Sequence, residues 1–144
     1  NSACTIGAYP VCDELVHHYG ILIPETSNTT DSKLTGILEK PCPEQTTSRL
    51  AISARYIFSP GIFNRIHTTP PSSSGEIYLT DAIEALISAG EIVRAVCLGK
   101  GEKRCDIGNH LAYFQTFVDY ALDDPEWGEQ IRTYMRQKLA EDRS

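Results

Sequence analysis

A glutamate and a lysine stand side by side at the end of an apolar segment that does not need them for packing. Residues 34–38 are mostly apolar, and Glu39, Lys40 and Pro41 follow directly. We expect a strand that ends at Pro41, because proline has no amide hydrogen to donate to a sheet. Ligands of open α/β sheets bind beyond the carboxyl ends of strands, so the carboxylate and the ammonium form a candidate binding site. The plainer alternative is a solvated ion pair beside a turn.

Gly20 and Asp106 are candidates because of where each stands relative to the predicted elements. Gly20 opens the apolar run at residues 21–23, where a glycine marks either a β-bulge or a place where a ligand approaches the main chain. Asp106 lies between a predicted strand and a predicted helix. A carboxylate there can interact with the helix dipole, cap the helix or hold a metal ion. Its position alone does not decide among these roles.

An α/β fold, with a mixed sheet and helical cover, is expected to position these side chains. Apolar runs of strand length occupy residues 4–11, 20–23, 34–38, 50–58 and 91–98. Apolar residues at helical spacing occupy residues 59–66, 80–89, 111–122 and 124–139. The polar, turn-rich segment 24–32 separates two of the strands, so we predict an antiparallel hairpin over residues 20–38.

Two helix starts carry residues typical of caps. Ser59 precedes a proline, a pair that favours an N-cap and a first helical turn. Thr80 and Asp81 stand at the start of the second helix, and Glu84 follows three residues after Asp81. This spacing predicts a capping box. The loop between these two helices, residues 68–75, is rich in proline, serine and threonine. It either closes over a ligand or serves only as a surface connection.

Composition and charge describe an ordinary globular chain. Its 144 residues are 41% hydrophobic and 22% charged, which is enough for one domain, or part of one, with a real core. A net charge of -6 without a basic stripe argues against binding to nucleic acid. No apolar run reaches the roughly 18 residues that a membrane span requires, and the first residues lack the pattern of a secretory signal. We therefore expect a cytoplasmic protein with no membrane association.

Neither the cysteines nor the glycines form a known functional motif. The five cysteines are odd in number and widely spaced, so neither a disulfide framework nor a zinc site is predicted. No phosphate-binding loop of the G-x-x-x-x-G-K-[ST] or G-x-G-x-x-G type occurs. The chain begins with Asn1 rather than methionine, so we expect a piece of a longer protein.

Five stretches of the sequence, taken in order, resemble a known enzyme family. They are YGIL at 19–22, GILEKP at 36–41, ARYIFSPGIF at 54–63, TPP at 69–71 with GEIYLTDAI at 75–83, and CDIGNHLAYFQTFVDYAL at 105–122. In this order and spacing they are similar to the C-terminal half of bacterial UTP-glucose-1-phosphate uridylyltransferases. The resemblance implies a nucleotide-diphospho-sugar transferase fold. It also implies a Mg²⁺-dependent reaction in which the phosphate of glucose 1-phosphate attacks the α-phosphorus of UTP.

The resemblance implies a role for each candidate residue. Gly20 matches the glycine whose main chain meets the sugar, since a residue without a side chain permits close approach. Glu39 matches the carboxylate that accepts hydrogen bonds from sugar hydroxyls. Lys40 matches the lysine on the sugar phosphate, where an ammonium neutralises the charge of the nucleophile. Asp106 matches the metal-binding aspartate, with Mg²⁺ as the expected ion.

Three small departures from the family pattern accompany one large absence. The common form G-R-Y is ARY at 54–56 here, E-I-Q-L-T-D is EIYLTD at 76–81, and a cysteine precedes Asp106 instead of following it. The family's N-terminal half, with its G-x-G-T-R loop, uridine-reading residues and second metal aspartate, is absent. We therefore expect one partial domain, residues 1–144, that binds glucose 1-phosphate or a related sugar phosphate. It would meet UTP only with the missing half and would be inactive alone.

Two alternatives to this assignment stay open. Another nucleotidyltransferase, such as a thymidylyltransferase, would share these segments, because base selection resides in the absent part. A hypothesis from a different class is a stand-alone, non-catalytic binding or oligomerisation module derived from this fold. Loss of half a sheet would expose strand edges, which favour self-association, so a homo-oligomer is expected.

Overall fold

The protein divides into two compact units, which are described separately. A computed structural model describes residues 2–26, 30–72, 75–102, 104–105 and 107–141. The first unit is Asn1–Glu102 and the second is Lys103–Ser144. Within the described residues, no helix is long and apolar enough to cross a membrane.

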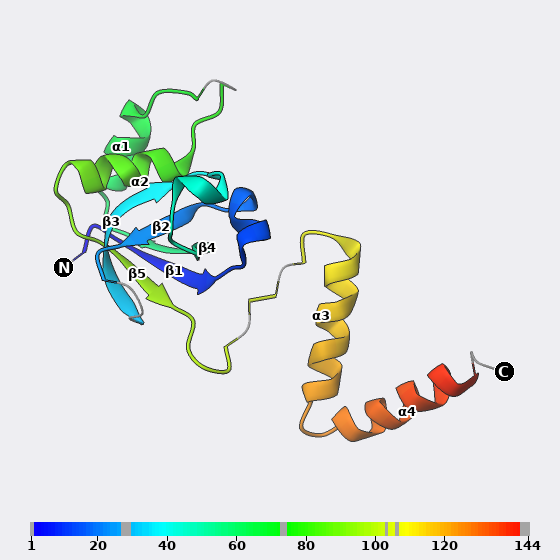
Figure 1. The fold of residues 1–144 in the computed structure, drawn as a ribbon. Coiled ribbons are helices and arrows are strands. Elements are labelled where there is room, and N and C mark those ends of the chain that lie inside the picture. The colour runs from blue at the N-terminus through cyan, green and yellow to red at the C-terminus, as the bar shows by residue number, and fades with distance from the viewer. Residues whose placement is uncertain (1, 27–29, 73–74, 103, 106, 142–144) are drawn as a thin grey trace. The chain divides into compact units, whose positions relative to one another are not determined.

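The described residues of the first unit form five strands, two α-helices and two short 3₁₀ helices (Figure 1). The strands are β1 (Cys4–Pro10), β2 (Ile21–Pro24), β3 (Asp31–Leu38), β4 (Leu50–Phe58) and β5 (Val93–Cys97). The helices are η1 (Asp13–His18), η2 (Pro43–Gln45), α1 (Ile62–Thr68) and α2 (Leu79–Ser88). Each predicted strand and α-helix of this unit is present within a few residues, whereas the 3₁₀ helices are not predicted by the sequence pattern.

The strands form a mixed sheet that closes into a barrel in the order β1-β4-β2-β3-β5. β1 runs parallel to β5, and the other neighbouring strands are antiparallel. β2 and β3 form the predicted hairpin, in which Ile21 pairs with Leu38. This register places the residue before β2 next to the residue after β3. The mixed α/β architecture is therefore confirmed, while the closure of the sheet was not predicted.

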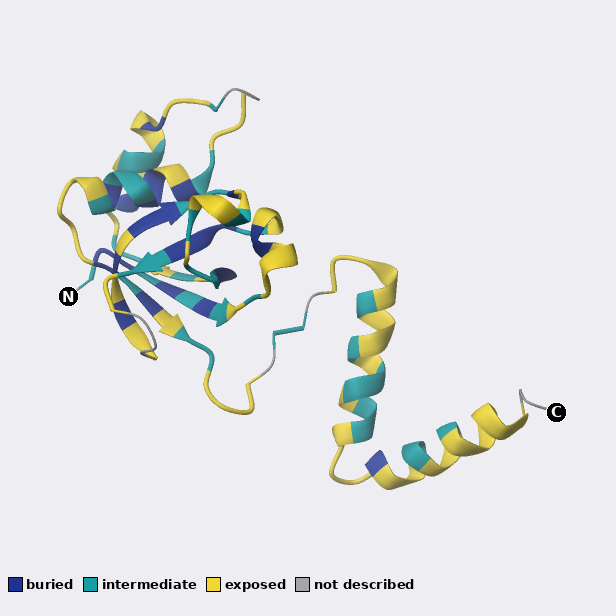
Figure 2. Cartoon of the chain, in the orientation of Figure 1, coloured by how far each residue is buried: buried dark blue, intermediate teal, exposed yellow. Residues whose placement is uncertain are grey.

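One apolar core lies between the sheet and α2. Its largest fully buried side chains include Ile6 from β1, Leu22 from β2, Leu34 from β3, and Ile83 and Leu86 from α2. Full burial of such a side chain stabilises the folded state by about 1.5–3 kcal/mol. Figure 2 shows the buried positions as stripes along the strands and along α2, and α1 and α2 lie together on one side of the sheet (Figure 1). The helical cover that the pattern predicted is thus present.

The predicted helix caps of this unit are wrong. α2 has Tyr78 as its N-cap, without a side-chain capping bond. Glu84 does not form a capping box; its Oε2 accepts a hydrogen bond from the Ile37 amide of β3, at 2.9 Å. α1 begins with Gly61 as N-cap instead of Ser59. The Glu84 carboxylate, predicted to accept a hydrogen bond at the start of α2, therefore accepts one from the main chain of β3 instead.

The second unit consists of α3 (His110–Asp123) and α4 (Gly128–Glu141), two helices that the sequence predicts. The Asn109 side chain caps α3 by accepting a hydrogen bond from the Ala112 amide at 2.8 Å. The Asp124 carboxylate accepts hydrogen bonds from the amides of Glu126 and Trp127. α4 begins at Gly128, four residues after the predicted start at Asp124, and the Asp124 side chain satisfies two amides of the turn that precedes the helix.

Ala54 lies in an irregular part of β4 with a backbone conformation unusual for alanine. Its φ is 56°, in the left-handed region where residues with a Cβ are strained. The β1–β4 register shifts between Ile6 and Ala8, so β4 contains extra residues opposite this point. Ala54 occupies the first position of the segment whose common family form is G-R-Y, and a glycine there would avoid the strain.

Candidate functional site

Glu39 and Lys40 lie directly after the last residue of β3. The Lys40 amide donates a hydrogen bond to the Tyr19 carbonyl at 3.2 Å, which fixes this segment to the chain that enters β2. Lys40 has a φ of 44°, so the backbone turns sharply at the lysine. A strained conformation for a residue with a side chain costs about 1–2 kcal/mol, and such residues cluster at functional sites.

The two charged side chains form a loose, accessible pair. Lys40 Nζ lies 3.9 Å from Glu39 Oε1, and the lysine side chain is 57% exposed against 24% for the glutamate. A pair this exposed contributes little to stability. The ammonium is therefore accessible to a ligand from solvent, and the carboxylate is partly accessible.

Gly20 lies beside this pair, because β2 begins next to the end of β3. Its carbonyl accepts a hydrogen bond from the Ile52 amide at 3.0 Å. A Cβ on Gly20 would lie 2.6 Å from Ile52 Cδ1 and 3.4 Å from Glu39 Oε2. The structure thus brings Gly20, Glu39 and Lys40 together, and it gives the glycine a packing reason that exists without any ligand.

Thr80, in the first turn of α2, completes the group. Its hydroxyl donates a hydrogen bond to Glu39 Oε2 at 3.0 Å, and the residue is buried. Tyr56 of β4 lies near the same carboxylate: burial, with the added effect of the charges of Glu39 and Cys4, raises the pKa of the Tyr56 hydroxyl. The sequence pattern indicates only a helix cap for Thr80 and no role for Tyr56. No spacing rule links a strand end to a helix 40 residues later.

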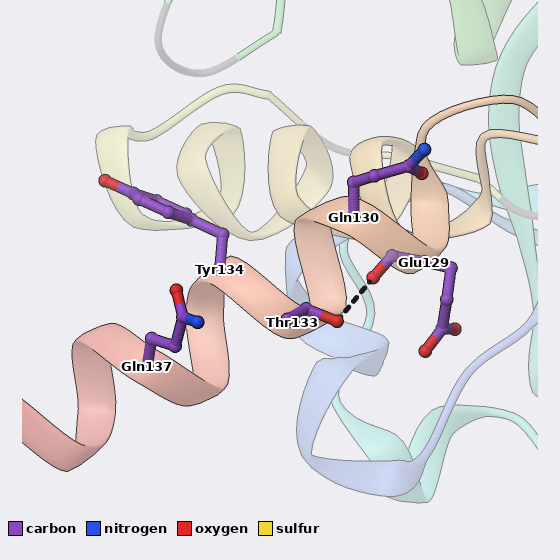
Figure 3. A pocket seen from close by; sticks show the side chains of 5 residues that line it. All are labelled: Glu129, Gln130, Thr133, Tyr134 and Gln137. Atoms are coloured by element: carbon purple, nitrogen blue, oxygen red, sulfur yellow. Dashed lines mark hydrogen bonds between the residues drawn. The ribbon is translucent and has the colours of Figure 1, made fainter.

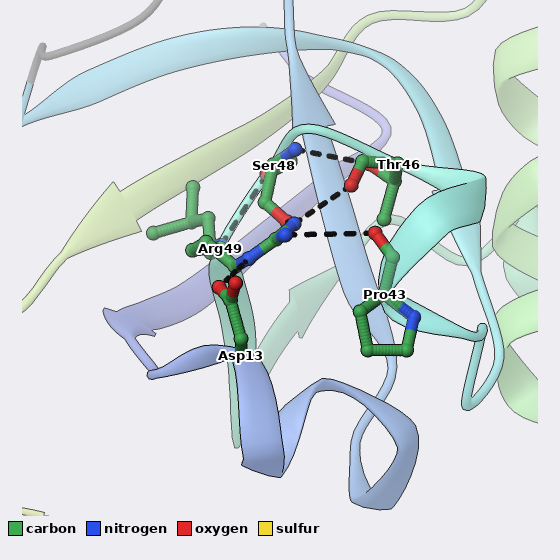
Figure 4. A network of polar contacts seen from close by, with 6 residues as sticks. Asp13, Pro43, Thr46, Ser48 and Arg49 are labelled. Carbon is green, nitrogen blue, oxygen red and sulfur yellow. Dashed lines mark hydrogen bonds and ion pairs between the residues drawn. The ribbon is translucent and has the colours of Figure 1, made fainter.

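Arg49 connects η1 and the segment around η2, which lie before Gly20 and after Lys40 in the chain (Figure 4). Its guanidinium pairs with Asp13 of η1 and donates hydrogen bonds to the carbonyls of Pro43 and Thr46, in and beside η2. The guanidinium lowers the pKa of the Asp13 carboxyl, first through the hydrogen bond and then through its charge. Because η1 precedes Gly20 and η2 follows Lys40, this network restrains the two segments that hold the site.

The fourth predicted residue, Asp106, lies outside the described residues. In the part of the chain that the structure describes, no group of three or more histidine, cysteine, aspartate or glutamate side chains is placed to hold a metal ion. The described residues thus supply an anion-attracting ammonium and a hydrogen-bonding carboxylate. This combination suits a ligand that carries both a phosphate and hydroxyl groups.

Three of the hollows in the described residues, of about 390, 530 and 520 Å³, do not include the predicted site. A hollow of about 390 Å³ lies on α4 (Figure 3), where Thr133 donates a hydrogen bond to the Glu129 carbonyl. All its lining side chains come from that one helix: Glu129, Gln130, Thr133, Tyr134 and Gln137. A second hollow, of about 530 Å³, lies within the first unit, and its one charged lining residue, Arg49, is engaged in the network above.

Residues 1–122 match the family model described as Nucleotidyl transferase. The chain belongs to this family. Among curated proteins, it is 36% identical over 134 residues to a UTP–glucose-1-phosphate uridylyltransferase of Bacillus subtilis, covering 93% of this chain and 45% of that protein. A protein of the same name from Staphylococcus epidermidis is 32% identical over 132 residues, covering 92% of this chain and 45% of its own length. The chain therefore spans about half the length of these relatives.

Solved structures of the family have the same fold. A UTP-bound UGPase from Acinetobacter baumannii matches 92% of this chain and 45% of its own, with a TM-score of 0.78 and 30% identity. A UDP-glucose pyrophosphorylase complexed with UDP-glucose matches 82% of this chain and 44% of its own, with a TM-score of 0.73 and 28% identity. The α/β architecture is therefore that of a nucleotide-sugar transferase.

Proposed function

We propose that this chain is the sugar-phosphate-binding, C-terminal part of a UTP–glucose-1-phosphate uridylyltransferase. The observation that carries the proposal is the meeting of Gly20, Glu39 and Lys40 at the junction of β2 and β3. The names of the most similar curated proteins support the substrate assignment. The chain's share of those relatives, 45% of their length, supports a part of the enzyme that needs the remainder for turnover.

Each residue of the site has a defined task in this proposal. The Glu39 carboxylate accepts hydrogen bonds from ring hydroxyls of the hexose, and the Gly20 main chain lies against the sugar. The Lys40 ammonium binds the phosphate of glucose 1-phosphate. An oxygen of that phosphate attacks the α-phosphorus of UTP, the bond from this phosphorus to the β-phosphate oxygen breaks, and pyrophosphate leaves. Lys40 reduces the repulsion between the two anions, and positioning of the two substrates supplies the rest of the rate acceleration.

Asp106 and Mg²⁺ remain part of the proposal through the family resemblance alone. A carboxylate oxygen is a ligand that Mg²⁺ prefers, so the residue type fits the ion. When bound, the ion would neutralise phosphate charge. Self-association and a cytoplasmic location likewise stay predictions.

Titration calorimetry with glucose 1-phosphate, with and without Mg²⁺, tests the proposal. We expect the unaltered chain to bind glucose 1-phosphate and to release no pyrophosphate from UTP. Lys40→Ala should weaken binding by about 10-fold to 100-fold, since a hydrogen bond to a charged group contributes about 1.5–3 kcal/mol. Asp106→Ala should remove only the Mg²⁺-dependent part of binding.

Two results would contradict the proposal. Absence of binding by the unaltered chain would favour the non-catalytic module. Conversion of UTP and glucose 1-phosphate to UDP-glucose by the pure chain would refute its inactivity. Lys138→Ala is the matched control: this lysine pairs with Glu141 on α4, so its removal should leave the affinity unchanged.

A further inference from the structure

α2 holds the end of β3 at two points that lie one helical turn apart. The Thr80 hydroxyl donates to Glu39 Oε2 at 3.0 Å, and Glu84 Oε2 accepts from the Ile37 amide at 2.9 Å. Residues four apart lie on the same face of a helix. One face of α2 therefore forms hydrogen bonds with the two residues that flank Leu38 in the chain. The strand end that bears the charged pair is therefore fixed by the helix as well as by the sheet.

The contact from Thr80 gives the two oxygens of Glu39 different surroundings. Oε2 accepts the hydrogen bond from the threonine, which is only 6% exposed. Oε1 lies 3.9 Å from Nζ of Lys40, whose side chain is 57% exposed. A carboxylate held by one oxygen cannot rotate freely about its last bond, so the other oxygen keeps a defined direction toward an incoming hydroxyl.

The Thr80 side chain is itself restrained by Gly20. Its Cγ2 methyl would lie 3.2 Å from a Cβ on Gly20, so the methyl packs against the bare main chain at the start of β2. A β-branched side chain has few allowed rotamers. One rotamer of Thr80 therefore both places the methyl against Gly20 and directs the hydroxyl at Glu39.

We infer that Thr80 is a positioning residue, which acts through Glu39 to strengthen binding of the sugar part of the sugar phosphate. The inference rests on the proposed function, because it needs a sugar that Glu39 binds. Thr80 itself touches no ligand in this scheme. Its loss should therefore weaken binding of the hexose and leave recognition of the phosphate group unchanged.

Calorimetric titrations of three Thr80 forms with glucose 1-phosphate and with inorganic phosphate test the inference. Thr80→Val keeps the shape and removes the hydroxyl; we expect affinity for glucose 1-phosphate to fall by about 10-fold, through loss of one hydrogen bond from a sugar hydroxyl to the misoriented Glu39 carboxylate. Affinity for inorganic phosphate should not change. Thr80→Ser retains the hydroxyl and should restore most of the affinity. Thr133→Val, on α4, is the matched control and should behave as the unaltered chain.

A double-mutant cycle with Glu39→Ala separates positioning from a general effect on packing. If Thr80 acts through Glu39, Thr80→Val should have no further effect on glucose 1-phosphate affinity once Glu39 is alanine. The inference is overturned if Thr80→Val lowers glucose 1-phosphate affinity equally with Glu39 and with alanine at position 39. It is also overturned if Thr80→Val binds like the unaltered chain while Glu39→Ala binds weakly. If the unaltered chain binds no glucose 1-phosphate, the proposed function fails first, and the inference falls with it. Thermal unfolding of each variant confirms that the binding data refer to folded protein.

Discussion

Replacement of Lys40 by glycine should stabilise the protein while it weakens binding of the sugar phosphate by about 10-fold to 100-fold. Lys40 has a φ of 44°, a conformation that glycine adopts without strain. Its side chain carries the charge that the proposed site needs. Glycine and alanine at this position both remove the charge, but only glycine removes the strain.

The magnitude follows from two opposing terms. Relief of the left-handed conformation should stabilise the folded state by about 1–2 kcal/mol. The greater freedom of glycine in the unfolded chain should cost about 0.4–1 kcal/mol. The lost ion pair with Glu39 contributes close to zero, because its atoms are 3.9 Å apart and the lysine side chain is 57% exposed. We expect Lys40→Gly to raise the free energy of unfolding by about 1 kcal/mol, and Lys40→Ala to leave it nearly unchanged.

Urea unfolding followed by circular dichroism gives the stabilities, and calorimetry gives the affinities for glucose 1-phosphate. Both variants should lose affinity by the same factor, since both lack the ammonium. A Lys40→Gly variant no more stable than Lys40→Ala would refute the claim of backbone strain. A Lys40→Gly variant with unaltered affinity would refute the role of the charge.

Two further predictions concern β4 and the core. Ala54→Gly should raise the free energy of unfolding by about 1 kcal/mol by the same two terms, whereas Ala54→Val should lower it; a regular strand would give the opposite order, and urea midpoints decide. Burial raises the pKa of the Cys4 thiol to about 12 from its ordinary value of 9.0. The unfolded chain therefore releases this proton first as the pH rises, so stability should fall between pH 9 and 12. Urea midpoints compared with those of Cys4→Ala should show this difference only above pH 9.

The sequence predicts the elements well because their patterns are local. The apolar runs that became β3 and β4 and the helical spacing in α2 each follow from residues close in the chain. The hairpin of β2 and β3 is local too, since a turn-rich segment joins its strands. Register then follows, because a shift by one residue would turn the buried Leu34 toward solvent.

Contacts between distant segments are what local patterns do not predict. Barrel closure requires β5 to pair with both β1 and β3. Nothing in the sequence of β5 shows whether it pairs with one neighbouring strand or with two. The capping box around Glu84 was a sound local interpretation, yet the carboxylate binds the Ile37 amide. A buried amide that lacks a strand partner costs free energy until it finds an acceptor, so the tertiary contact wins over the cap.

Gly20 shows how packing and ligand recognition can demand the same residue. A Cβ there would lie 2.6 Å from Ile52 Cδ1 and 3.2 Å from Thr80 Cγ2, closer than van der Waals contact allows. An alanine would therefore have to move the end of the Ile52 side chain and shift the Thr80 methyl by a few tenths of an ångström, which disturbs the hydrogen bond that orients Glu39. A glycine required only for close approach of a sugar would leave Glu39 unaffected by its replacement. The packing at Gly20 makes the orientation of the carboxylate depend on the glycine, whether or not a ligand touches the main chain.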